Sequence, residues 1–175
     1  MFSLKKDLAG QGPAPKVADQ VAQVAEQLYR SGEMHCAEAV LAAVKRVFAP
    51  QIPDEVVQMA GGFGGGSGAG CICGAVSGGT MALGLAMSGD KKTVALMTRE
   101  LHRWFKEDYG ATCCKILTAH GKSGCVKLTA SVAGRVAELL LETGLQPAVA
   151  AATVGVGEVE SVRGEMVPLV PEISK

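Results

Sequence analysis

The chain has 175 residues, nearly half of them hydrophobic, and its 17 Lys and Arg side chains balance 17 Asp and Glu side chains. A chain of this length is expected to form one domain with a substantial core. Without a basic stripe, the sequence gives no electrostatic support for binding nucleic acid. No apolar run reaches ~18 residues without Gly or a charge, so we expect no membrane span.

The segment 1–15 contains Gly and Pro and lacks helical periodicity, which predicts a flexible N-terminal arm. It contains no apolar h-region of the kind found in secretory signals, so we expect a cytoplasmic protein. Disulfides are rare in that compartment. The six cysteines are therefore expected to be buried thiols, metal or cluster ligands, or a reversible redox pair.

Apolar residues recur at helical spacing along most of the chain. The pattern predicts a short helix opened by Pro53 and four long helices, at about 16–31, 36–48, about 91–109 and about 124–143. Asp90 is expected to cap the helix at 91–109. The buried stripe of that helix is expected to contain Val94, Met97, Leu101, Trp104 and Phe105.

The stretch GGFGGGSGAGCICGAVSGG, residues 61–79, interrupts the helical pattern with glycine. Residues 73–89 still look helical, with Gly74, Gly78 and Ala82 at positions i, i+4 and i+8. A helix face of such small residues lets another helix or a bound group approach the backbone closely. Together these features predict an all-α fold, a single-domain helical bundle with a glycine-rich loop.

The predicted four-cysteine helical domain covers residues 16–145, and residues 146–175 form a C-terminal tail. We expect this tail to be irregular or β-like and to pack on the domain or on a partner subunit. Helices lined with Ala and Gly, together with the apolar stretch at 166–170, favour a homodimer.

Four cysteines from separate segments fall at predicted helix N-termini: Cys36, Cys73, Cys114 and Cys125. The unpaired N–H groups and the positive end of the helix dipole lower a thiol's pKa at such positions and suit an anionic cluster. Cys71 and Cys113 adjoin two of these four, and we interpret them as spectators, resolving thiols or substitute ligands.

The histidines and the other polar residues give a weaker signal. His35 adjoins Cys36 and His120 lies between Cys114 and Cys125, and we interpret both as surface or core histidines, with contact to a cysteine ligand as the alternative for either. No Ser/His/Asp set and no carboxylate pair stands out, so no catalytic residue is predicted and the question of enzymatic activity is left open.

The residues Cys73-Gly74-Ala75-Val76-Ser77-Gly78 and their glycine-rich lead, GGFGGGSGAGC, resemble the motif of the C_GCAxxG_C_C family of redox-active proteins. The resemblance covers about residues 20–143. The family is named for four cysteines, and by this resemblance the other three correspond to Cys36, Cys114 and Cys125.

This family is similar to the cluster-binding part of split-Soret cytochromes, which implies an iron–sulfur centre. The chain contains no CxxCH, so c-type haem is not implied. It differs from the family by its additional Cys71 and Cys113.

We therefore expect a redox-active protein that binds a 2Fe–2S or 4Fe–4S cluster through Cys36, Cys73, Cys114 and Cys125, for electron transfer or redox sensing. The electron-transfer partner is unknown. Backbone N–H groups are expected to reach the cluster from Gly64, Gly65, Gly66, Gly70 and Gly74. Two alternatives are left open: a metal-free thiol–disulfide redox protein, and a zinc or copper thiolate site in a helical interaction module.

Overall fold

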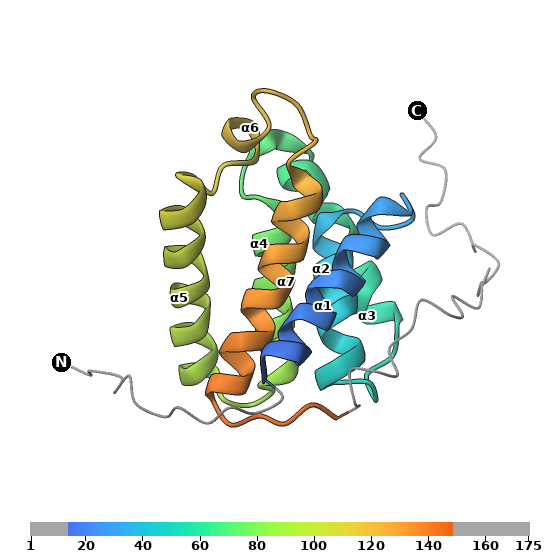
Figure 1. The fold of residues 1–175 in the computed structure, drawn as a ribbon, viewed down its shortest axis with the longest axis vertical. Coiled ribbons are helices and arrows are strands. Elements are labelled where there is room, and N and C mark those ends of the chain that lie inside the picture. Colours follow the sequence, from blue (N-terminus) through green and yellow to red (C-terminus); the bar gives the residue numbers. More distant parts are fainter. Residues whose placement is uncertain (1–13, 149–175) are drawn as a thin grey trace, which may run out of the picture.

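The computed structural model describes residues 14–148, with side chains from Val17 onwards. This part of the chain is a helical bundle without a strand (Figure 1). Its seven α-helices are α1 Ala14–Arg30, α2 Cys36–Phe48, α3 Glu55–Gln58, α4 Gly74–Ala86, α5 Lys91–Tyr109, α6 Cys114–Leu117 and α7 Cys125–Glu142. The predicted all-α fold is confirmed.

The helix boundaries follow from local chemistry, and α2 and α5 have the predicted bounds. The predicted N-cap of α5 is confirmed, because the Asp90 side chain accepts a hydrogen bond of 3.0 Å from the Thr93 N–H. Gly110 ends this helix in a left-handed conformation, with φ 78°. At α2, the His35 N–H donates to Glu38 Oε2 over 2.9 Å, which satisfies one of the unpaired donors of the first turn.

The glycine-rich segment before α4 is more ordered than the predicted loop. It contains a 3-10 turn, η1 Gly61–Phe63, and a π-helical turn, η2 Gly66–Gly70. Ser67 and Gly68 inside η2 have positive φ angles of 59° and 66°. Glycine tolerates this conformation without steric cost, so the composition permits a tight coil with a run of left-handed residues instead of an extended loop.

Close contact between α4 and α2 defines the centre of the bundle. A Cβ built on Gly78 would lie 2.8 Å from the Cα of Ala37 and closer still to its carbonyl oxygen. A Cβ on Gly79 would lie 2.9–3.1 Å from side-chain atoms of Leu101, Val132 and Val136. The small-residue face of α4 is thus filled by α2 on one side and by α5 and α7 on the other.

One continuous core joins these helices. Helix α7 packs against α1, α2, α4 and α5, and α5 covers one flank through Met97, Leu101 and Phe105 (Figure 1). The predicted stripe of α5 is partly wrong, because Val94 and Trp104 are only half buried. Helix α5 packs against α4 and α7 on one flank of the bundle, so part of its surface stays open to solvent.

The predicted arm at 1–15 and the predicted tail at 146–175 lie almost wholly outside the described residues, so both stay predictions. Helix α1 begins at Ala14, two residues before the predicted start. Among the described helices, none combines the length and the apolar character needed to cross a membrane.

Two glycine-to-alanine variants of α4 are expected to have opposite effects on stability. Gly78→Ala should lower the free energy of unfolding by about 1–3 kcal/mol, because the new Cβ overlaps the α2 backbone. Gly84→Ala, with no atom within 4 Å of its Cβ, should raise it by about 0.5–1 kcal/mol. Urea unfolding followed by circular dichroism measures both values, and equal stability of the two variants would contradict the proposed close contact.

Candidate functional site

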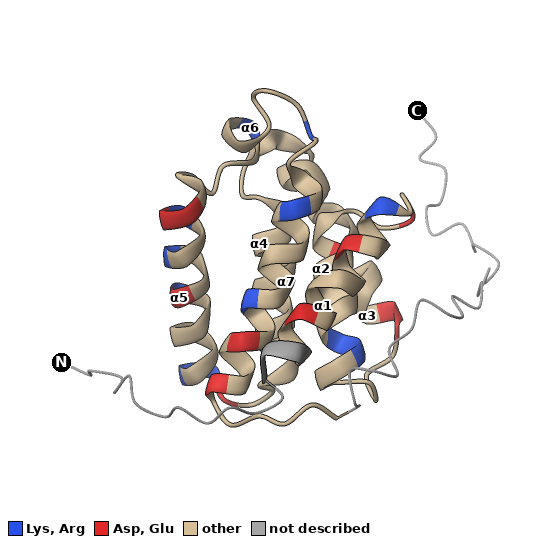
Figure 2. Cartoon of the chain, in the orientation of Figure 1, with Lys and Arg blue, Asp and Glu red and all other residues tan. Residues whose placement is uncertain are grey.

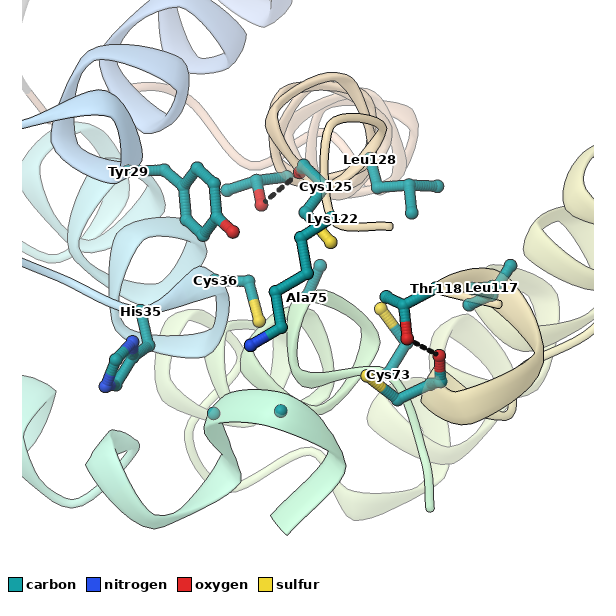
Figure 3. Close-up of a pocket in the computed structure, with 14 residues that line it drawn as sticks. Tyr29, His35, Cys36, Cys73, Ala75, Leu117, Thr118, Lys122, Cys125 and Leu128 are labelled. Atoms are coloured by element: carbon teal, nitrogen blue, oxygen red, sulfur yellow. Dashed lines mark hydrogen bonds between the residues drawn. The ribbon is translucent and has the colours of Figure 1, made fainter. Parts of the chain in front are cut away.

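A pocket of about 230 Å³ lies at the end of the bundle where α2, α4, α6 and α7 begin. All four cysteines predicted to act together line it: Cys36, Cys73, Cys114 and Cys125 (Figure 3). Each lies at a helix N-terminus as predicted, Cys73 as the N-cap of α4 and the other three as first helical residues. Residues separated by up to 89 positions in the chain are therefore brought to one cavity.

Threonine side chains hold the first turns that carry two of these thiols. Thr118 Oγ1 donates to the carbonyl of Cys114, and Thr129 Oγ1 donates to the carbonyl of Cys125, each over 2.8 Å. Thr129 is fully buried, so this hydrogen bond also satisfies a hydroxyl that water cannot reach.

Of the glycines predicted to reach the cluster, two line the pocket and two allow close packing beside it. Gly64 and Gly65 line it directly. Gly66 and Gly74 instead allow close packing, because a Cβ on Gly66 would lie 2.7 Å from Cys114 Cβ, and one on Gly74 would lie 2.5 Å from Cys36 Sγ.

Gly70 lies further out, where a Cβ would meet the Cβ of Lys115 at 3.1 Å. Its φ of 74° favours glycine in any case. Binding of a cofactor by these glycines stays a prediction.

A short backbone ribbon connects Cys73 to Cys114. The Cys73 N–H donates to the carbonyl of Thr112 over 2.8 Å, and the Cys114 N–H donates to the carbonyl of Cys71 over 2.5 Å. Between these two hydrogen bonds Ile72 and Cys113 form an isolated antiparallel bridge. The ribbon positions the two thiols even though α6 has only four residues.

Burial overrides the expected effect of the helix N-termini on the thiols. The prediction of lowered pKa values is wrong for Cys36, Cys73 and Cys114, because burial raises the pKa of each, and that of Cys73 to about 11. Amide groups of the first turn do oppose the rise, those of Ala75 and Val76 at Cys73, but desolvation is the larger effect.

The pocket thiols also raise one another's pKa values. Charge on Cys125 or Cys114 would repel charge on Cys36, and charge on Cys125 would repel charge on Cys114. The Gly65 amide opposes the rise at Cys36. Without a bound cation, the site therefore favours the protonated form of Cys36, Cys73 and Cys114.

Tyr29, at the end of α1, is a pocket residue that the sequence did not reveal. Its hydroxyl points into the cavity (Figure 3). Burial and the neighbouring Cys125 thiol raise the pKa of Tyr29 to about 12, so the hydroxyl keeps its proton and can donate to a sulfur. The chain turns at Gly32 between α1 and α2, so the end of α1 lies beside the start of α2. This turn could have predicted from the sequence that Tyr29 lies near Cys36.

Of the side chains that the structure describes, one lysine and no acidic residue line the pocket. Residues 110–125 contain Lys115 and Lys122 and no Asp or Glu, and residues 56–89 carry no charge (Figure 2). Lys122 lines the pocket and opposes the rise in the pKa of Cys114. His35 lines the pocket and is exposed, and His120 is exposed too, which agrees with the interpretation of both as surface histidines.

The two additional cysteines do not line the pocket. Cys71 is exposed, and the Cys113 thiol donates a hydrogen bond of 3.2 Å to the carbonyl of Gly70. Among the side chains described from residue 17 to residue 148, no three of His, Cys, Asp and Glu are grouped so that they could hold a single metal ion.

The stability of the metal-free protein is expected to fall as the pH rises from about 9 towards 11. Unfolded thiols lose their protons near pH 9, whereas folded Cys73 keeps its proton up to about 11, so only the unfolded state gains free energy by ionising in this window. Urea unfolding between about pH 8 and about pH 10.5 should show this decline, with a smaller slope in Cys73→Ser than in Cys71→Ser. Equal slopes in the two variants would contradict the effect of burial on Cys73.

Residues 34–139 match the protein family described as "Putative redox-active protein (C_GCAxxG_C_C)". This range is more than half of the chain and includes all six cysteines. No curated protein matches the chain, and no solved structure does. Similarity to split-Soret cytochromes is not shown by these comparisons and stays a prediction. The chain belongs to the C_GCAxxG_C_C family of redox-active proteins.

Proposed function

We propose that Cys36, Cys73, Cys114 and Cys125 bind an iron–sulfur cluster for electron transfer or redox sensing. The observation that carries this proposal is the convergence of four thiols from four helix N-termini on one pocket. Thiolates are the usual ligands of such clusters, and four of them suit a 2Fe–2S or a 4Fe–4S form. A bound cluster would supply reversible one-electron transfer.

The electrostatics of the pocket fit an anionic group with a cationic metal core. The metal ions would offset both the burial and the mutual repulsion that raise the pKa values of Cys36 and Cys114, since a coordinated thiol is deprotonated. Lys122 and the amides of Gly65, Ala75 and Val76 would then stabilise the negative charge of the thiolates and of the cluster.

The size of the pocket favours a cluster over a single zinc or copper ion. Four thiolates bind one zinc ion at about 2.3 Å, which leaves no cavity between them. Here the thiols border about 230 Å³, several times the roughly 30 Å³ that one water occupies in the liquid.

We also propose a homodimer and a cytoplasmic location, where an oxidant-sensitive cluster would persist.

Protein purified without oxygen should be brown and contain iron and acid-labile sulfide. Replacing any of Cys36, Cys73, Cys114 and Cys125 by Ser should abolish or strongly reduce both contents, because each variant removes one ligand. Cys71→Ser and Cys113→Ser are the matched controls and should keep them, since neither residue lines the pocket.

The competing functions give different outcomes in the same measurement. Colourless protein without iron after anaerobic reconstitution would overturn the cluster and favour the metal-free thiol–disulfide protein. Stoichiometric zinc or copper without sulfide would favour a site for a single metal ion.

A further inference from the structure

The ribbon beside the pocket places a cysteine opposite one of the pocket thiols. Its two hydrogen bonds, from Cys73 to Thr112 and from Cys114 to Cys71, flank the bridge between Ile72 and Cys113. In this antiparallel register Cys71 is directly opposite Cys114. The hydrogen bond of 2.5 Å from the Cys114 N–H to the Cys71 carbonyl limits the separation of their Cα atoms to at most about 6.4 Å, within the range of about 4.4–6.8 Å found in disulfides.

The same register separates this pair from the other cysteines of the ribbon. Cys73 is opposite a threonine, and Cys113 is opposite an isoleucine. The Cys113 thiol donates to the carbonyl of Gly70, and Cys73 is only 6% exposed. Only Cys71 and Cys114 therefore combine a cysteine partner across the ribbon with access from solvent.

Gly66 keeps the two residues at this close distance. A Cβ at this position would lie 2.7 Å from Cys114 Cβ and 2.7 Å from the Cys71 backbone nitrogen. The Cys71 N–H donates to the Gly66 carbonyl over 3.0 Å, which anchors the Cys71 backbone while its side chain is exposed.

We propose that Cys71 and Cys114 form a reversible disulfide when the protein meets a hydroperoxide. The Cys71 sulfur attacks the peroxide, the O–O bond breaks, and the thiol proton goes to the displaced oxygen; the products are Cys71 sulfenic acid and an alcohol, or water when the oxidant is hydrogen peroxide. The Cys114 sulfur then attacks the Cys71 sulfur, the S–O bond breaks, and the departing hydroxyl group takes up the Cys114 thiol proton to give water.

The electrons of this reaction balance. The two sulfurs together lose two electrons, and the O–O bond of the peroxide gains them. A dithiol of low molecular weight reverses the reaction and is itself oxidised to a disulfide. If the proposed function is correct, the disulfide also removes Cys114 from the four cluster ligands. Oxidation of Cys71 would then lower the amount of cluster that the protein binds.

The experiment uses the full-length, fully reduced and metal-free protein, so that its result does not depend on cluster binding. Hydrogen peroxide at one equivalent should remove two of the six thiols per chain. Tryptic digestion without reductant should then yield peptide 47–91 joined to peptide 107–115, and dithiothreitol should separate them. Because each peptide contains two cysteines, variants must identify the pair.

Cys71→Ser and Cys113→Ser form the matched pair, since both residues lie in the ribbon and outside the pocket. The cross-link should be lost in Cys71→Ser and retained in Cys113→Ser, with unchanged helical content by circular dichroism in both. The double variant Cys73→Ser/Cys113→Ser should also retain it, because it keeps only the proposed pair in these peptides. Loss in Cys113→Ser with retention in Cys71→Ser, a cross-link between two chains, or no cross-link at all would overturn the proposal.

Discussion

The contact of α4 with the start of α2 is the constraint on which the rest of the structure depends. Gly78 lies against the Ala37 backbone, and Gly74, one turn earlier, lies against the Cys36 sulfur and the Phe63 carbonyl. A side chain at either position would move α4 outward, and with it the N-terminal residue Cys73. The residues that close the core are therefore also the residues that bring two pocket thiols together, so stability and site geometry cannot vary independently.

The electrostatics of the pocket follow from a competition between burial and helix N-termini. A thiolate at an exposed N-terminus is stabilised by the dipole, but here the cost of removing charge from water exceeds that gain at Cys36, Cys73 and Cys114. The amides are nevertheless oriented towards the sulfurs, so they act once a cation has displaced the protons. Binding of any metal group to these thiols would release protons, and its affinity would rise with pH.

The sequence predicted most of the helices and the four pocket thiols, because both depend on local signals. Apolar spacing marked α2 and α5, Asp90 and Gly110 set the bounds of α5, and N-terminal positions marked the cysteines. Other features depend on tertiary contacts that no local pattern encodes. Burial reversed the expected pKa shifts, and Tyr29 and Lys122 reached the pocket through the packing of α1 and the loop before α7. The coil at η2 was missed because glycine permits many conformations, and contact with Cys71 and Cys114 selects one of them.

The four thiols are held by supports of unequal rigidity. Cys36 and Cys125 begin helices of 13 and 18 residues that pack into the core. Cys114 begins a helix of only four residues, too short to be stable alone, and it keeps its place through the ribbon to Cys71 and through the space left by Gly66. Opening of this ribbon would release Cys114 and loosen the N-cap at Cys73, while the other two thiols stayed in place. A chemical change in the ribbon would therefore act first on Cys114.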